Sequence, residues 1–264
     1  GVAGQDNYGY LGGPSTLDIA ALQSLYDARA NVNAGNTTYV LPDRNVLGTY
    51  FQAIWDTGGT DTIAYDGTDN AFIDLRPAGL GLASPPEGGL SRTGTINPVG
   101  LNFGGYLIAN GVTIENARGG SNADDIQGND VANVMKGNGG GDKFFGQDGN
   151  DTIFGGGGND SVLEGGDGAD HVWGGSGSDT FVFTEATHGG DFWYDFDQSD
   201  DQIALYRTYF GNTNTGTLAQ AGITFQLGKT ASSGSGPTVL WDRASGELRY
   251  DHNGTGAGQS TLLA

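Results

Sequence analysis

Residues 119–182 consist of seven consecutive units: GGSNADDIQ, GNDVANVMK, GNGGGDKFF, GQDGNDTIF, GGGGNDSVL, GGDGADHVW and GGSGSDTFV. The period is nine residues, interrupted only by Glu164, an extra residue before the sixth unit. Position one is always Gly and position eight is always apolar. Position six is Asp in every unit except the second, which has Asn133. A fixed short period of this kind predicts a solenoid in which the units stack on one another.

The spacing within each unit predicts a six-residue turn followed by a three-residue strand. Glycine has no Cβ and tolerates positive φ, so the turn can curl its carbonyl oxygens toward one point. Two units complete one coil, so unit n stacks on unit n+2, and five such pairs are expected. The position-eight side chain then points into a thin core, which would contain Ile126, Met135, Phe144, Ile153, Val162, Val172 and Phe181.

The position-six side chains predict cation sites between stacked turns. Carboxylates and backbone carbonyls together provide the oxygen ligands, about six to eight, that Ca²⁺ accepts in a flexible geometry. Mg²⁺ needs a tighter octahedron and gives up water reluctantly, so Ca²⁺ is the expected ion. The candidate side chains are Asp124, Asn133, Asp142, Asp151, Asp160, Asp170 and Asp179.

The energetics of such a chain predict folding that depends on the metal. Ordering each residue costs roughly 1–2 kcal/mol, and glycine costs most, whereas one buried apolar side chain returns about 1.5–3 kcal/mol per unit. Stacked carboxylates also repel one another without a cation. We therefore expect the repeats to be disordered without Ca²⁺. Unit two is the weakest, with Asn133 and Val131 replacing Asp and Gly, and Glu164 should bulge the coil.

The composition of the 264-residue chain fits this expectation. Its formal net charge is −20, with 26 Asp but only 5 Glu, and the short Asp stem keeps the carboxylate near backbone carbonyls. So negative a chain is unsuited to nucleic acid and to anionic lipid surfaces. It contains no apolar run of membrane-spanning length. The absence of cysteine excludes disulfides and thiolate zinc sites.

Shorter signals flank the repeats. An S-x-x-D capping box at Ser15 predicts a short helix over about 16–28. Residues 77–105 are rich in Pro and Gly and predict a long surface excursion. Strands are expected upstream at Thr37–Leu41, Ala53–Trp55, Thr62–Tyr65, Ala71–Leu75 and Val112–Asn116. Further strands are expected downstream at Thr180–Phe183, Ile203–Phe210, Gly222–Leu227, Thr238–Asp242 and Glu247–Asp251.

Together these signals predict an all-β fold, a calcium-binding parallel β-roll flanked by β-sandwich strands, with one short N-terminal helix. Four regions are expected: an N-terminal segment 1–36, a strand-rich region 37–118, the roll 119–182, and a C-terminal region 183–264. The last three strands of the C-terminal region look antiparallel, and they would cap the open end of the solenoid.

Three segments carry a resemblance to a known family. They are LDIAALQSLYDA at Leu17–Ala28, WDTGGTDTIAYDG at Trp55–Gly67 and GVTIENARGGSNADD at Gly111–Asp125. They resemble the C-terminal half of the serralysin metalloproteases, and the repeats match the RTX nonapeptide signature. The resemblance implies a calcium-loaded module of a secreted bacterial protein. It also implies a type I secretion apparatus as partner, which reads a C-terminal signal.

The resemblance also implies calcium ligands beyond the position-six residues. Outside the repeats they correspond to Asn33, Gly35, Thr37, Asp56, Gly58, Gly59, Asp61, Thr113 and Glu115, and after the repeats to Asp195 and Asp201. In the roll, the family uses carbonyls of the early turn positions. These correspond to Gly120, Asn122, Asn129, Val131, Gly137, Gly139, Gly140, Gly146, Asp148, Gly149, Gly155, Gly157, Gly158, Gly165, Asp167, Gly168, Gly174 and Ser176.

The catalytic part of that family is not expected in this chain. Its zinc site needs an H-E-x-x-H-x-x-G-x-x-H frame, whereas His171, His188 and His252 are far apart and in no such frame. The expected function is therefore a non-catalytic calcium-binding module that supports secretion and stability of a serralysin-like protease. The alternatives are a structural or adhesive extracellular protein that binds a surface layer, matrix or glycan, and an enzyme with an unrecognised site.

Overall fold

The computed structural model describes residues 32–42, 51–79, 88–94, 104–185, 190–206, 224–227, 237–242, 247–251 and 260–263. All the regular secondary structure within these ranges is β-strand. The predicted helix at about 16–28 and much of the 77–105 excursion lie outside them. In the part of the chain that is described, no helix has the length and apolar character needed to cross a membrane.

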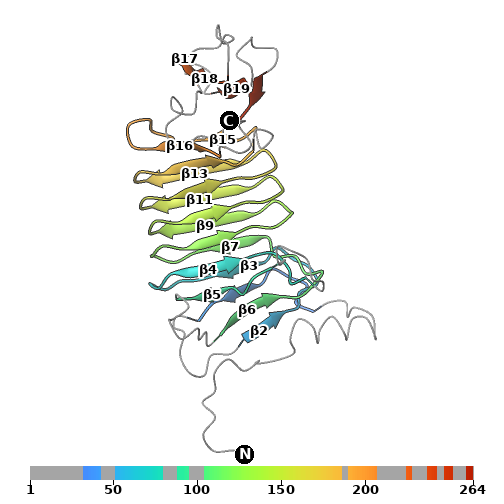
Figure 1. The fold of residues 1–264 in the computed structure, drawn as a ribbon. Helices are drawn as coiled ribbons and strands as arrows, with labels where there is room; N and C mark the ends of the chain where they lie inside the picture. Colours follow the sequence, from blue (N-terminus) through green and yellow to red (C-terminus); the bar gives the residue numbers. More distant parts are fainter. Residues whose placement is uncertain are drawn as a thin grey trace, which may run out of the picture.

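Two seven-stranded sheets form the body of the molecule (Figure 1). The first has the order β1 (Thr38–Val40), β3 (Thr62–Ala64), β7 (Asn116–Arg118), β9 (Val134–Gly139), β11 (Thr152–Gly157), β13 (His171–Ser176) and β15 (Phe192–Trp193). The second has the order β16 (Gln202–Leu205), β14 (Thr180–Phe183), β12 (Val162–Glu164), β10 (Lys143–Phe145), β8 (Asp125–Gln127), β4 (Ala71–Asp74) and β5 (Arg92–Thr93).

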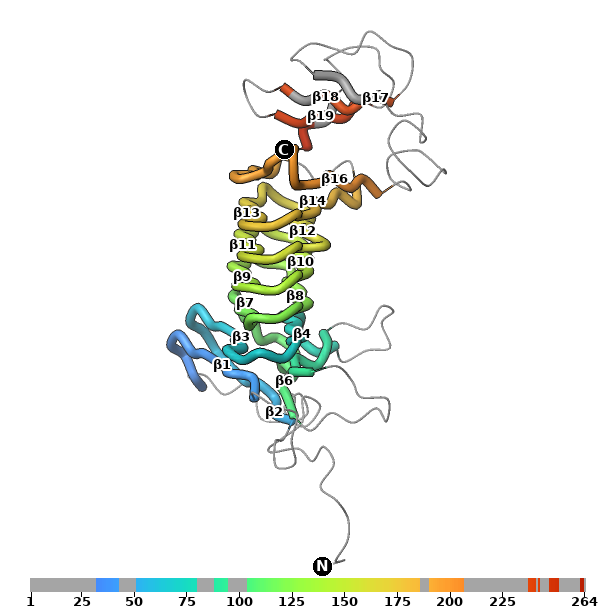
Figure 2. The backbone as a smooth tube through the Cα atoms, turned by 90° about the vertical axis from the view of Figure 1, so that its left-hand side faces the viewer, coloured from blue at the N-terminus to red at the C-terminus, as the bar shows by residue number. Residues whose placement is uncertain are grey.

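The two sheets are the two sides of a parallel β-roll, as Figure 2 shows in side view. Strands from successive units alternate between the sheets, and each pairs in parallel with the strand two units away. All five predicted stacked pairs are therefore confirmed. The fold class is also confirmed, except for the helix, which is outside the described residues.

The core between the sheets contains one large apolar side chain per unit. Six of the seven predicted position-eight residues are buried there, with at most 1% of their surface exposed. The fifth unit differs: Leu163, at position nine, pairs with Phe144 and fills the core, whereas Val162 is only partly buried. The prediction for Val162 was wrong because the extra residue is accommodated between Asp160 and Leu163, ahead of Glu164.

The roll begins well before the recognisable repeats. Strands β3 and β7 continue the first sheet, and β4 continues the second by pairing with β8. The upstream strand was predicted at Val112–Asn116, but β7 starts at Asn116, because Glu115 occupies the turn position that precedes every strand of this sheet. The proposed boundary at residue 119 stays a prediction, while the two sheets run across it without interruption.

Two smaller sheets lie at the ends of the roll. Strands β2 (Phe51–Ile54) and β6 (Gly105–Ile108) pair in parallel at one end. At the other end are β17 (Thr224–Leu227), β18 (Thr238–Asp242), β19 (Glu247–Asp251) and β20 (Ser260–Leu262). The pair β18–β19 is antiparallel as predicted, but β17–β18 is parallel. Sequence alternation is the same for both directions, so it could not distinguish them.

The C-terminal sheet closes the roll by apolar contact and by hydrogen bonds. Phe183 of the roll shares a buried cluster with Val239, Leu248 and Leu263. The carbonyl of Leu263 accepts hydrogen bonds from the backbone N–H groups of Gly190 and Asp191, at 3.1 and 3.3 Å. The prediction of a capping role for these strands is therefore consistent with the contacts in the structure.

Candidate calcium-binding turns

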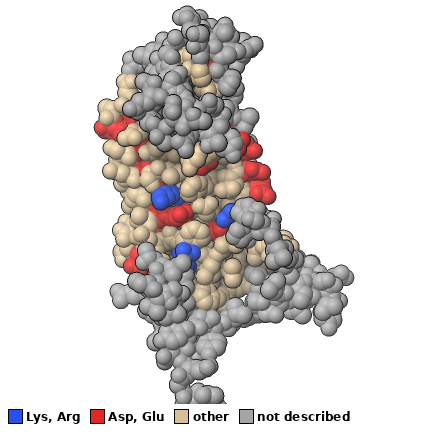
Figure 3. All heavy atoms as spheres, in the orientation of Figure 1, with Lys and Arg blue, Asp and Glu red and all other residues tan. Residues whose placement is uncertain are grey.

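The position-six side chains form two continuous stacks along the margins of the roll. In each stack, a backbone N–H donates to the carboxylate Oδ1 of the next position-six residue at 2.7–3.1 Å. We call them the odd stack, with Asp124, Asp142, Asp160, Asp179 and Asp201, and the even stack, with Asn133, Asp151, Asp170 and Asp191. On the face shown in Figure 3, exposed acidic atoms lie at the margins of the roll and, beside Lys or Arg atoms, in its middle.

We call each residue of a stack a rung. In the rungs that are aspartates, the second carboxylate oxygen is the informative atom. The Oδ2 atoms of Asp142, Asp151, Asp160 and Asp179 are buried without a hydrogen-bond partner, and so is that of Asp61. Buried polar atoms nearly always have a partner, because burying one unpaired costs free energy. Five such anionic atoms at repeated positions therefore indicate that a cation belongs beside them.

The first glycine of each unit shows where such a cation fits. A Cβ added at Gly155 would overlap both the Oδ2 of Asp160 and the carbonyl oxygen of Gly174 in the next coil. A Cβ at Gly146 would likewise overlap Asp151 Oδ2 and the Gly165 carbonyl. Carboxylate and carbonyl oxygens thus converge on one cradle per turn, a donor set that suits Ca²⁺.

Burial raises the pKa values of most aspartate rungs. It raises the pKa of Asp124 to about 6, those of Asp142 and Asp160 to about 7, and that of Asp151 to about 8, while backbone N–H donors partly oppose the shift. The pKa values of Asp179 and Asp191 are also raised, chiefly by burial. Without a cation, Asp142, Asp151 and Asp160 therefore resist carrying a full charge at neutral pH.

The predicted ligands upstream of the repeats belong to the same even stack. The N–H of Thr37 donates to Asp61 Oδ1, and the N–H of Asp61 donates to Glu115 Oε2, both at 2.7 Å. Asp56 accepts from Tyr39 Oη at 2.7 Å, and its charge and that of Glu115 help burial to raise the pKa of Asp61. The structure therefore brings Thr37, Asp56, Asp61 and Glu115 together.

The remaining upstream predictions are only partly connected to this group. Gly59 lies against the backbone of Gly35, and Gly58 donates its N–H to Asp56 Oδ1 at 3.1 Å. Asn33 has a φ of 50° and donates through Nδ2 to Tyr39. Thr113 is exposed on the turn before Glu115.

Unit two departs from the pattern as expected. The amide of Asn133 donates through Nδ2 to the Glu115 carbonyl and to Asn129 Oδ1, both at 3.0 Å, and accepts the N–H of Asn129 through Oδ1. Its hydrogen-bonding capacity is thus satisfied within the protein. Val131, unlike Gly140, Gly149 and their equivalents, does not have a positive φ. This rung offers an amide oxygen where the others offer an anion.

Several predicted carbonyl ligands also connect the coils. The carbonyls of Gly157, Asp167 and Ser176, at position three, accept position-four N–H groups from the preceding coil at 2.8 Å. Their place on the turn agrees with the predicted early-turn set, whose role as ligands stays a prediction. The side chains of Asp148 and Asp167 extend from the turn surface and are not part of either stack.

Asp195 and Asp201 occupy different places after the last repeat. Asp201 is the final rung of the odd stack: its Oδ1 accepts the N–H of Asp179 at 3.0 Å. Asp195 accepts the N–H groups of Gly174 and Gly175, both at 2.9 Å. The corresponding final rung of the even stack is Asp191, which the sequence reasoning missed because it lies beyond the nonapeptide period.

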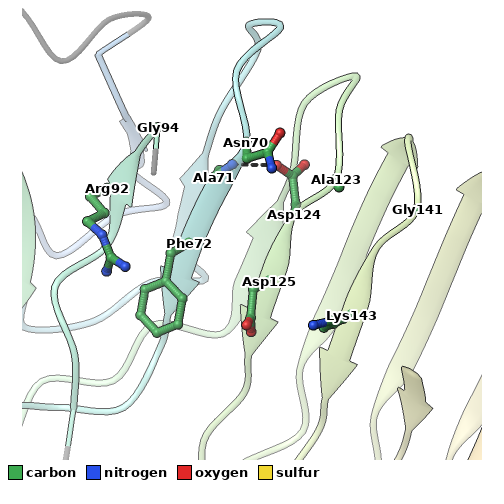
Figure 4. Close-up of a pocket in the computed structure, with 10 residues that line it drawn as sticks. All are labelled: Asn70, Ala71, Phe72, Arg92, Gly94, Ala123, Asp124, Asp125, Gly141 and Lys143. Carbon is green, nitrogen blue, oxygen red and sulfur yellow. Dashed lines mark hydrogen bonds between the residues drawn. The ribbon is translucent and has the colours of Figure 1, made fainter. Parts of the chain in front are cut away.

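The described residues contain no cluster of three or more His, Cys, Asp or Glu side chains able to hold a metal. The roll would instead use two carboxylates per turn pair and carbonyls for the rest. Beside Asp124, the first rung of the odd stack, lies an open pocket of about 250 Å³ (Figure 4). There Asp124 accepts the N–H of Ala71, and Arg92 lies 4.6 Å from the ring centre of Phe72.

Comparisons with known protein sequences identify the family of the chain. The family model described as the C terminal of peptidase M10 serralysin matches residues 31–225, which include every predicted ligand. Metallopeptidase AprA of Pseudomonas marginalis is 38% identical over 125 residues, which are 44% of this chain and 23% of that protein. Serralysin B of Dickeya chrysanthemi is 36% identical over 126 residues, again 44% and 23%. Serralysin of Photorhabdus luminescens is 34% identical over 133 residues, which are 46% of this chain and 24% of that protein. The matched part spans about a quarter of these relatives.

Proposed function

The chain belongs to the peptidase M10 serralysin C-terminal family, and from that premise we propose that it is a non-catalytic module whose β-roll folds by binding calcium. The ions would lie between stacked turns, held by the position-six carboxylates and by turn carbonyls. The observation that carries the proposal is the series of buried carboxylate oxygens without a hydrogen-bond partner along both stacks.

The chemistry of these turns favours calcium over other ions. Every candidate ligand atom is an oxygen, and carbonyls outnumber carboxylates, which suits a hard cation that accepts many ligands in a flexible geometry. Zinc and copper prefer His or Cys ligands, which the position-six set does not provide. When bound, the ion supplies the positive charge that allows two aspartates to share one cradle.

Coupling of binding to folding follows from the thinness of the core. One buried apolar residue per unit contributes only about 1.5–3 kcal/mol, which cannot offset the entropy of ordering nine residues. The raised pKa values of the rungs add a further cost at neutral pH. The free energy of calcium binding then becomes free energy of folding.

We further propose that the chain is the C-terminal part of a secreted bacterial metalloprotease and supports its export through a type I system. Support comes from the relatives, which are named as metallopeptidases or serralysins and match the chain over about a quarter of their length. Modules with millimolar to submillimolar calcium affinity are typical of extracellular proteins. A module of this kind would stay unfolded during export and fold on arrival outside the cell.

Calorimetric titration of the metal-free chain tests the calcium proposal. We expect several Ca²⁺ ions to bind together with folding of the chain, and Mg²⁺ to bind much more weakly. A chain that binds no Ca²⁺ would overturn the proposal. Export is tested separately, by fusing the chain to the C-terminus of a reporter in a bacterium with a type I system. A reporter that stays in the cell would remove the secretion role and leave the calcium role standing.

A further inference from the structure

An aromatic stack runs across three strands on the outer face of the first sheet. Phe154 on β11 and Trp173 on β13 are paired in register, and Tyr194 directly follows β15; their rings stack with centroids 4.7 and 4.1 Å apart and interplanar angles of 19° and 5°. Beside it, His171 stacks on Phe192 at 5.2 Å. The rings therefore lie with their faces along the roll axis.

One end of the stack is covered by a cation from the chain itself. The ammonium of Lys136, on β9, lies 5.4 Å from the ring centre of Phe154. The negative face of an aromatic ring attracts a cation at this distance. The opposite end, at the edge strand β15, consists of Phe192 and Tyr194.

The end at β15 is open to solvent. Phe192 and Tyr194 are 54% and 51% exposed. Because the stack covers one face of each ring, exposure of half the residue means that the outer faces are accessible. The two rings lie side by side, with centroids 6.5 Å apart and planes within 29°. A 2.6 Å hydrogen bond between Tyr194 Oη and His171 Nδ1 fixes the orientation of the second ring. Phe192 and Tyr194 thus form a nearly flat platform, which we call the β15 platform.

The electrostatic surroundings of the platform select its ligand. Residues 144–206 contain thirteen Asp or Glu and no Lys or Arg. Calcium would neutralise part of this charge in the turns, but exposed groups such as Asp197 and Asp200 keep theirs. An acidic region attracts cations over a Debye length of about 8 Å at physiological salt, and two open ring faces then bind them directly.

We propose that the β15 platform binds arginine side chains of a basic segment in a partner protein. A guanidinium is planar and stacks on aromatic faces, so it would add the next layer to the stack, as Lys136 does at the other end. Two arginines separated by one residue in an extended segment would cover both rings, because side chains repeat on one face with period two. The two rings provide no calcium ligand, although their neighbours Asp191 and Asp195 belong to the candidate turns, and the proposal goes beyond the proposed function.

The test is an NMR titration of the calcium-loaded full chain at about 0.15 M salt, where long-range attraction is screened. The probe is a blocked tripeptide, Arg-Gly-Arg, and the control peptide carries citrulline, a neutral analogue of similar shape, in place of arginine. We expect the arginine peptide to shift the ring resonances of Phe192 and Tyr194. The citrulline peptide should bind several-fold more weakly.

Variants separate the platform from diffuse charge. Phe192→Ala and Tyr194→Ala should each weaken arginine-peptide binding roughly two- to fivefold. The matched control is Tyr206→Ala, which removes a tyrosine that is 60% exposed elsewhere and should change nothing. Circular dichroism and calcium content confirm that each variant is folded. The proposal is overturned if the platform variants bind as the parent chain does, if the citrulline peptide binds equally well, or if no peptide binds.

Discussion

The odd and even stacks share one backbone geometry but differ in charge. Every rung of the odd stack, from Asp124 to Asp201, carries a carboxylate. The even stack contains one amide, Asn133, which lies between Glu115 and Asp151. Yet the N–H of Asn133 donates to the next rung at 2.7 Å, the same distance as for Asp124.

This difference shows that closing the turn and carrying a charge are separate roles of the position-six side chain. Because the coil closes around Asn133 with its side chain fully hydrogen-bonded, the turn itself does not require a carboxylate. At Asp142, Asp151, Asp160 and Asp179, one carboxylate oxygen completes the turn and the other is left buried without a partner. The charged rungs thus destabilise the folded state of the metal-free chain, whereas with a bound cation they stabilise it.

The largest expected effect comes from removing a carboxylate. Asp160→Ala should lower the free energy of unfolding by roughly 3–5 kcal/mol in saturating Ca²⁺, since the ion loses a charged ligand. Asp151→Ala should behave similarly. Asn133→Ala should cost less, about 1–3 kcal/mol, and by the same amount at saturating Ca²⁺ and at the lowest Ca²⁺ concentration that keeps the chain folded. Denaturant unfolding at these two calcium levels makes the comparison. Equal calcium dependence in Asp160→Ala and Asn133→Ala would contradict the assignment.

The next largest effect concerns the extra residue in unit five, and it is a difference in stability between two variants. Leu163→Ala should cost about 2–5 kcal/mol, because Leu163 is 1% exposed in the core. Val162→Ala should cost less than about 1 kcal/mol, because Val162 lies on the outer face. Thermal unfolding of both variants in Ca²⁺ measures the difference. A larger loss in Val162→Ala would restore the position-eight pattern of the sequence.

Adding a charge to the even stack should make the two stacks alike. Asn133→Asp removes the Nδ2 donors to Glu115 and Asn129, so the folded chain should lose about 1–3 kcal/mol of stability at the lowest Ca²⁺ concentration that keeps it folded. At saturating Ca²⁺ this loss should shrink, because the new carboxylate can face an ion. The check is calcium affinity by calorimetry beside the unfolding midpoint. A variant whose calcium affinity is unchanged would argue that this rung does not border a cation.

The last effect is a pH dependence of the metal-free chain. In the folded roll the pKa values of Asp142 and Asp160 are about 7 and that of Asp151 is about 8, against about 3.9 in the unfolded chain. Stability from these raised pKa values is fully present below about pH 4 and is lost as the pH rises through 7 to 8. Chelated protein should therefore keep more β-structure at pH 5 than at pH 8.5. The opposite trend would mean that the rungs are not buried as described.

The repeats could be interpreted from sequence because each unit carries the whole signal within nine residues. Gly at position one, Asp at six and an apolar residue at eight are all local, and so the five stacked pairs followed. The position of the extra residue did not follow, because Val162 and Leu163 are both apolar and either could fill the core. Only the register with Phe144 distinguishes them.

The ends of the stacks were less predictable. Upstream of Asp124, the next position in the odd stack is occupied by Ala71 instead of an aspartate. Residues 77–105 also separate Ala71 from the next coil in the sequence, so no period of nine residues is visible there. Downstream, Asp191 and Asp201 continue the stacks at spacings of 21 and 22 residues instead of 18 or 19. The resemblance supplied Asp201, while Asp191 became recognisable only through its bond to the N–H of Asp170.

Folding of the two stacks by calcium is tested most directly by circular dichroism of the metal-free chain with and without Ca²⁺. At neutral pH the chelated chain should lack most of its β-structure, and adding Ca²⁺, but not Mg²⁺, should restore it with several ions bound by elemental analysis. A spectrum that is unchanged by chelation, with no bound Ca²⁺, would contradict the claim.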